Sequence, residues 1–206
     1  MVDTATDRKQ LRLEMRRRAI LEAAAAEFAR VGFERATLDD IGARVGLSKA
    51  GLYYYVEGKE QLLGDLFGEA ISAIELRAGE LTPLRANSAE RLRAFVTAHV
   101  EVGVATPAGR VLAHHLELVL TRESSAQLRQ RHQDTLACIL QDGIRTGEFR
   151  PLEVGPVVQM LFAALNSIPC WFDTAGPLTV DGLMDEIGGL FLAGILKPGP
   201  ETPIEL

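Results

Sequence analysis

The chain has 206 residues and a net charge of −6, with 47% hydrophobic and 24% charged residues, values close to those of globular proteins. A chain of this length can bury a core without disulfide or metal support, and with only 6% aromatic residues that core must consist of Leu, Ala, Val and Ile. The charge is uneven: residues 1–60 carry 11 Lys and Arg against 10 Asp and Glu, and residues 61–206 carry 11 against 18. An acidic body with a nearly neutral head suits a protein that presents one end to a polyanion.

Cysteine usage and hydropathy suggest the compartment. Cys138 and Cys170 lie far apart in the chain and show no Cys-x-x-Cys spacing. The N-terminus is polar and does not resemble a signal peptide, so we expect two buried thiols in a reducing compartment. The apolar stretches look short and broken by charge, below the ~18 to 20 residues that a membrane span needs. The expectation is a cytoplasmic protein without a membrane partner.

The N-terminal third predicts three helices. Residues 1–10 are polar and unpatterned, so we expect a flexible arm. Apolar residues at helical spacing predict a first helix over residues 11–31. Thr37 is placed to cap a second helix, which the left-handed conformation open to Gly46 would end, and Ser48 is placed to cap a third. Two short helices joined at such a turn form a helix-turn-helix over residues 37–55.

The rest of the chain predicts only helices. A long helix begins at Lys59 and continues to about Leu81, and no segment alternates like a strand. Further helices are predicted over residues 89–105, 107–122, 125–146, 153–172 and 180–196, followed by a loose, Pro-rich tail over 198–206. The predicted fold class is all-α, with about nine helices.

The run from Phe28 to Leu63 carries a resemblance to a known family. It reads FARVGFERATLDDIGARVGLSKAGLYYYVEGKEQLL, and it combines the glycine turn, the two capping hydroxyls, a Leu-Tyr pair and the Lys that opens the long helix. This run resembles the DNA-binding head of the TetR family of repressors. The resemblance implies a DNA-binding domain over 11–58 and a ligand-binding and dimerisation bundle over 59–197.

Candidate DNA-binding residues follow from the helix-turn-helix. The first turns of a recognition helix face base edges, which implicates Lys49, Ala50, Gly51 and Tyr54, with Lys49 as the best base reader. Thr37 and Ser48 are expected to receive phosphates at helix N-termini. Family positions on the backbone side are matched by Tyr53, Tyr55 and Lys59, and Arg18 of the basic run 16–18 adds charge.

Simpler interpretations exist for each of these residues alone. Thr37 and Ser48 would cap helices in any helical protein, and the basic run could be a solvated face. One of the three tyrosines must pack instead of facing DNA, and Tyr53 is the first choice for a mixed role. The combination in one short span favours groove binding.

The last two helices are the most apolar and are expected to form a homodimer interface across a two-fold axis. Some of their residues must instead be ordinary core. The candidate interface residues are Val158, Leu161, Leu165, Ile187, Leu190 and Phe191.

Polar residues inside the apolar middle helices are candidates for binding a ligand. In the family, these helices enclose a cavity whose filling moves the long helix that starts at Lys59. The candidate ligand-binding residues are His99, His114, His115, Asn166 and Trp171. A metal site at His114-His115-x-Glu117 is disfavoured, because adjacent residues point about 100 degrees apart on a helix. The effector is expected to be a hydrophobic small molecule, with an acyl thioester as one hypothesis.

Two other functions compete with this interpretation. An enzyme is disfavoured because the chain has no nucleophile elbow, no phosphate-binding glycine loop and no metal-ligand spacing, and no cofactor is expected. An architectural DNA-binding subunit without a ligand would have a closed body. The expected function is therefore a ligand-responsive regulator, a dimer that binds a palindromic double-stranded DNA operator, usually to repress.

Overall fold

The computed structural model describes residues 4–120 and 123–196, and within them the chain is all-α as predicted. Nine α-helices and one short 3-10 helix, η1, account for the regular structure of the described residues, beside one isolated bridge between Phe149 and Leu196. The elements are α1 Thr4–Val31, α2 Leu38–Arg44, α3 Lys49–Tyr53, α4 Lys59–Leu81, α5 Ser88–Ala105, α6 Pro107–Leu120, η1 Glu123–Ser125, α7 Ala126–Thr146, α8 Val154–Trp171 and α9 Val180–Ile195.

The flexible arm expected over residues 1–10 is wrong for the part that the structure describes. Helix α1 already begins at Thr4, although residues 4–10 are mostly polar and show no apolar repeat. A polar solvated helix gives no periodic signal, so the pattern detected only the packed part of α1. The tail expected over residues 198–206 lies outside the described residues.

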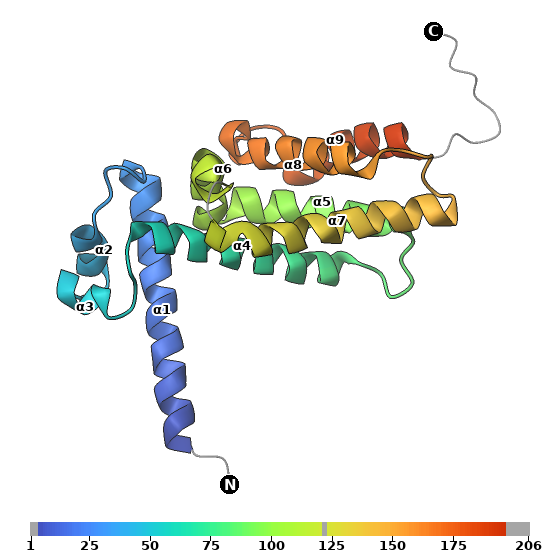
Figure 1. The fold of residues 1–206 in the computed structure, drawn as a ribbon. Coiled ribbons are helices and arrows are strands. Elements are labelled where there is room, and N and C mark those ends of the chain that lie inside the picture. The colour runs from blue at the N-terminus through green and yellow to red at the C-terminus, as the bar shows by residue number, and fades with distance from the viewer. Residues whose placement is uncertain (1–3, 121–122, 197–206) are drawn as a thin grey trace.

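The helices form a head and an elongated body (Figure 1). Helix α1 stands across one end of the molecule, with α2 and α3 on its outer side, and α4 runs from the head into the body. Helix α4 packs against α5 and α6, and α5 also contacts α7, α8 and α9. Helices α8 and α9 both appear on one side of the body (Figure 1), and each of them packs against α5.

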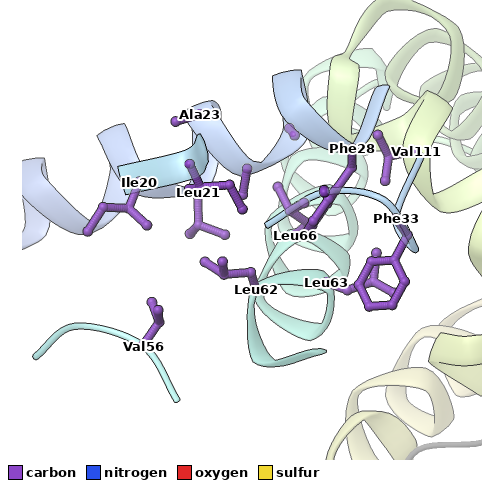
Figure 2. Packing of buried hydrophobic residues seen from close by; sticks show 14 of the residues in the cluster. Ile20, Leu21, Ala23, Phe28, Phe33, Val56, Leu62, Leu63, Leu66 and Val111 are labelled. Atoms are coloured by element: carbon purple, nitrogen blue, oxygen red, sulfur yellow. The ribbon is translucent and has the colours of Figure 1, made fainter. Parts of the chain in front are cut away.

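The hydrophobic core of the head extends into the body. Figure 2 shows Phe28 and Phe33 beside Leu66 of α4 and Val111 of α6. These residues belong to one buried cluster, which also contains Ile41 of α2 and Leu52 of α3. The boundary predicted between residues 58 and 59 therefore runs through one hydrophobic core, because the first turns of α4 complete the core of the head.

A buried carboxylate ties α1 to α2. The side chain of Glu27 is fully buried and accepts hydrogen bonds from Arg44 Nε at 2.8 Å and from Arg30 Nη2 at 2.5 Å. The hydrogen bond from Arg30 and that from Arg44 lower the pKa of Glu27, against the opposing effect of burial. The carboxylate therefore stays ionised and holds the helix-turn-helix against the helix that supports it.

Helix α8 and the cysteines differ from expectation. Over its 18 residues α8 has a mean hydropathy of 1.3, so by length and composition it could cross a membrane, as the core helix of a soluble protein also could. The expectation that no stretch reaches this length is wrong, although α8 packs against α5, α6 and α7.

Cys138 and Cys170 are exposed, and the expectation of two buried thiols is wrong as well.

Replacing Glu27 tests the tie between α1 and α2. Glu27→Gln removes the charge that two guanidinium groups share, so the melting temperature at pH 7 should fall by about 5 °C in circular dichroism. The same change at Glu22, whose pair with Arg18 is exposed, should move it by about 1 °C or less. Equal shifts for the two variants would show that Glu27 contributes no more than a surface charge.

The same pair of proteins predicts a pH dependence. A carboxylate whose pKa is lowered on folding stabilises the fold above its ordinary value of 4.5, and this contribution is lost as the pH falls through the lowered pKa. The difference in melting temperature between the wild-type protein and Glu27→Gln should therefore narrow as the pH falls below 4.5. A constant difference down to pH ~2 would contradict this.

Candidate functional site

The helix-turn-helix is built by two side-chain caps and a tight turn. Thr37 accepts a hydrogen bond from the Asp40 backbone N–H, and Ser48 accepts one from Gly51, both at 3.1 Å, which confirms both predicted caps. Gly46 has a φ of +66°, the left-handed conformation expected of it. Gly42 matters for another reason, since a Cβ there would lie 2.7 Å from the Leu47 carbonyl oxygen. This close approach sets α3 across α2.

Helix α3 presents one face to solvent and one to the core. Leu52 is fully buried, whereas Ala50 is exposed and Gly51 is half-buried. Lys49 Nζ lies 3.3 Å from the Asp39 carboxylate, and half of its side chain is exposed. A surface pair of this kind is weak. The start of α3 is therefore exposed, and its contacts with DNA stay a prediction.

The structure shows which of the three tyrosines is packed and which two are exposed, and this differs from the expectation. Tyr54 is 78% exposed and Tyr53 is 51% exposed. Tyr55 is the one that packs, against the core of the head and edge-to-face with Tyr54 at 5.1 Å between ring centroids. The prediction that Tyr53 is the tyrosine that packs is therefore wrong, and the DNA contacts of all three stay predictions. Helix α3 ends at Tyr53, so a helical projection could not predict the direction of the last tyrosine.

Lys59 has a structural role that its sequence position did not suggest. Its Nζ donates to the carbonyl oxygens of Phe33 and Glu34, at 2.9 and 3.1 Å, and lies 4.8 Å from the centroid of the Phe33 ring. The start of α4 is therefore held to the turn between α1 and α2. Arg18 is exposed and pairs with Glu22 at 3.3 Å. Phosphate contacts of both residues stay predictions.

A cavity of about 270 Å³ opens inside the body between α4, α5, α6, α7 and α8. Its wall is mainly apolar, and Arg129 is the one charged side chain among the described residues that line it. The polar lining residues besides Arg129 are His99, His132, Gln133, Gln159 and Asn166. A concave apolar space with a few polar groups is typical of small-molecule sites.

Two buried histidines and an asparagine form the polar part of the cavity. His99 Nε2 lies 3.0 Å from Asn166 Oδ1, and the imidazoles of His99 and His132 stack with centroids 5.7 Å apart. Burial lowers the pKa of His99 to about 4, although the hydrogen bond to Asn166 opposes the shift. Burial, reinforced by His99, lowers the pKa of His132 to about 3. Both rings are therefore neutral at physiological pH.

Only part of the predicted ligand set lines this cavity. His99 and Asn166 do, and His132 joins them although it was not predicted. The placement of His114, His115 and Trp171 in the cavity is wrong: His114 is exposed, Trp171 is 56% exposed, and His115 packs on Phe33. His132 lies in a largely polar helix, α7, and the one signal in the sequence that it is buried is the apolar residue Leu136 four positions later on the same face.

The predicted dimer interface also needs correction. Val158, Leu161 and Leu165 are buried in the core of the single chain, so they cannot form a surface. Ile187 and Phe191 are partly buried against the same cluster, whereas Leu190 is 75% exposed. Helices α8 and α9 are apolar on both sides, so periodicity could not separate the core face from the outer face. The exposed apolar residues of the two helices include Met160, Trp171, Gly189, Leu190 and Ala193.

No group of three or more His, Cys, Asp or Glu residues in the described part of the chain could hold a metal ion. The Glu117 side chain, the third member of the disfavoured metal motif, is outside the side chains that the structure describes.

Comparison with known proteins places both parts of the chain. Residues 20–66 match the model described as bacterial regulatory proteins, tetR family, and residues 85–195 match the tetracyclin repressor-like C-terminal domain. The HTH-type transcriptional repressor KstR2 of Mycobacterium tuberculosis is 27% identical over 206 residues, covering 94% of this chain and 99% of the repressor. The fatty acid metabolism regulator protein of Bacillus subtilis is 25% identical, covering 85% and 93%.

Solved structures agree with the fold. AibR in complex with isovaleryl coenzyme A and operator DNA has a TM-score of 0.73 and 27% identity, over 85% of this chain and 97% of AibR. The ketosteroid transcriptional regulator KstR2 of M. tuberculosis has a TM-score of 0.72 and 26% identity, over 89% and 96%. With a C-terminal domain model that matches more than half of its residues and an N-terminal model over the helix-turn-helix, the chain belongs to the TetR family of bacterial regulatory proteins.

Proposed function

We propose that this protein is a dimeric transcriptional repressor that binds a palindromic operator and releases it when a hydrophobic small molecule fills the cavity. The observation that carries the proposal is the double role of α4. Its residues Leu62, Leu63 and Leu66 complete the core of the head, and Phe67, Ile71 and Ile74 line the cavity. Ala70 belongs to both sets. A ligand that displaces the middle of α4 would therefore shift the core on which α3 rests.

Helix α6 supports the same coupling. Val111 and Leu112 lie in the core of the head, and Leu112 also lines the cavity beside Gly109 and Ala113. Two helices thus connect the ligand site to the DNA-binding head by direct packing. Because packed cores shift between discrete arrangements, a small displacement at the cavity can change the distance between the recognition helices of a dimer.

Relatives and the cavity wall together favour an acyl thioester or another lipid-derived effector. AibR was crystallised with isovaleryl coenzyme A and operator DNA, and the cavity here combines an apolar wall with Arg129. An apolar wall suits an acyl or ring system, and a guanidinium suits an anionic group. A regulator of this kind works in the cytoplasm and needs no catalytic residue or cofactor.

An operator is needed for the tests, and selection from genomic DNA with the purified protein should supply it. We expect a palindromic sequence with half-sites on one face of the duplex, spaced for a two-fold dimer. If the folded, full-length protein enriches no sequence above background, the proposed function is contradicted.

Lys49→Ala should weaken binding to the selected operator by about tenfold or more, with much less effect on random DNA, because base contacts carry sequence preference. Fluorescence anisotropy with both DNAs at fixed salt measures the difference. Arg85→Ala removes an exposed charge from the turn between α4 and α5, far along the chain from the head, and serves as the control. Equal losses on operator and random DNA would show that Lys49 does not read a base.

Leu190→Asp should convert the dimer to monomers and abolish tight operator binding, because it places a charge on the exposed apolar side of α8 and α9. Light scattering measures the mass. Leu84→Asp introduces the same charge at another exposed leucine, outside α8 and α9, and should leave the dimer intact. A dimer that survives Leu190→Asp would move the interface elsewhere.

Octanoyl coenzyme A and isovaleryl coenzyme A should raise the melting temperature of the free protein and release it from the operator, because a ligand that binds only the folded state stabilises it. Free coenzyme A is the control and should do neither. If free coenzyme A acts as strongly as the thioesters, the acyl group is not what the cavity recognises.

A further inference from the structure

The cavity contains buried hydrogen-bonding groups that the protein itself does not satisfy. His99 and His132 are 8% and 5% exposed, and His99 Nδ1 and both ring nitrogens of His132 have no hydrogen-bond partner among the described residues. Unsatisfied buried polar atoms are rare in native proteins, because each loses its hydrogen bonds to water without replacement. Where such atoms line a cavity, a bound molecule is the natural partner.

The hydrogen bond to Asn166 defines which partner His99 needs. Asn166 Oδ1 can only accept, so the neutral imidazole of His99 donates through Nε2–H at 3.0 Å. Its other nitrogen, Nδ1, is therefore an acceptor that requires a donor. His132 is also neutral, and its two nitrogens supply one donor and one acceptor.

Both histidines line the cavity, and the other described neighbours of the His132 ring offer no hydrogen-bond partner. The ring of His132 packs against Phe95 and Phe162, each with a centroid distance of 5.1 Å, and Phe162 also contacts His99 at 5.8 Å. These aromatic rings offer no conventional acceptor or donor. The imidazoles of the two histidines lie nearly parallel, with an angle of 21° between the ring planes.

We propose that the buried part of the preferred effector is an apolar skeleton, an acyl chain or another lipid-derived group, that carries one hydroxyl group hydrogen-bonded to the imidazoles of His99 and His132. The unsubstituted acyl chains of octanoyl and isovaleryl coenzyme A would bind without these hydrogen bonds. A hydroxyl donates one hydrogen bond and accepts another, so it satisfies the acceptor of one ring and the N–H of the other.

A ketone only accepts, so it leaves both acceptor nitrogens unpaired where a hydroxyl leaves one. A carboxylate also only accepts, and Arg129 of the same cavity is a better partner for it than two neutral imidazoles. The inference rests on the proposed function of the cavity as the effector site, and it specifies the chemistry recognised there.

Octan-2-ol and octan-2-one are matched probes, because they share one skeleton and differ in the ability to donate. Calorimetric titration of the wild-type protein should give at least about tenfold tighter binding of the alcohol, since a site built for a hydroxyl discriminates against an analogue that leaves its polar groups unpaired. Equal affinity for the two probes, or no binding of octan-2-ol, would overturn the inference and indicate that water satisfies the histidines.

Variants of His132 connect the preference to the residue. His132→Phe removes the donor and acceptor while keeping a ring, and should reduce the preference for the alcohol to about threefold or less. His132→Gln retains both functions and should keep more of the preference. A preference that survives His132→Phe would overturn the assignment.

A third measurement does not depend on a variant that folds. In ¹⁵N spectra of the wild-type protein, octan-2-ol should shift the imidazole nitrogens of His99 and His132 more than octan-2-one does. The calorimetric titrations and the ¹⁵N spectra use the protein without DNA, so they report on the cavity even if no operator is found. Failure to find an operator would therefore count against the proposed function and not against the hydroxyl site.

Discussion

The packing of α4 is the constraint on which the rest of the molecule depends. One helix completes the core of the head with Leu62, Leu63 and Leu66 and forms part of the cavity wall with Phe67 and its neighbours along the helix. A head with only the short α2 and α3 beside α1 would bury little apolar surface, so it depends on α4 and on Val111 of α6 for its core. The same dependence couples the head to whatever occupies the body.

Polar contacts hold this arrangement at defined points. Glu27 joins α1 to α2 through Arg44, and Lys59 binds the carbonyl oxygens of the turn between them. Both side chains are committed to the protein, so they orient the head more than they extend its contact surface. The exposed Lys49, Tyr53 and Tyr54 are then presented on a support whose position is set by buried contacts.

The cavity and the head differ in how their buried polar groups are satisfied. The head satisfies its buried charge with two guanidinium groups, whereas the cavity leaves neutral histidines without partners. Such groups reduce stability when the cavity lacks a suitable molecule, and a ligand that pairs them recovers that loss. Binding energy and conformational change would then arise at the same place, next to the helix that carries the head.

Local signals in the sequence determined the helices, the two caps, the glycine turn at Gly46 and the exposed start of α3, because each depends on residues within a few positions of one another. Only the tertiary structure decided which side of an apolar helix is core. It buried Val158, Leu161 and Leu165 and left Leu190 exposed, and it chose Tyr55 over Tyr53 for packing. It also moved Trp171, His114 and His115 out of the predicted site and brought His132 from a polar helix to His99. These contacts join residues that are distant in the chain, and periodicity along one helix contains no information about which neighbour will cover each face.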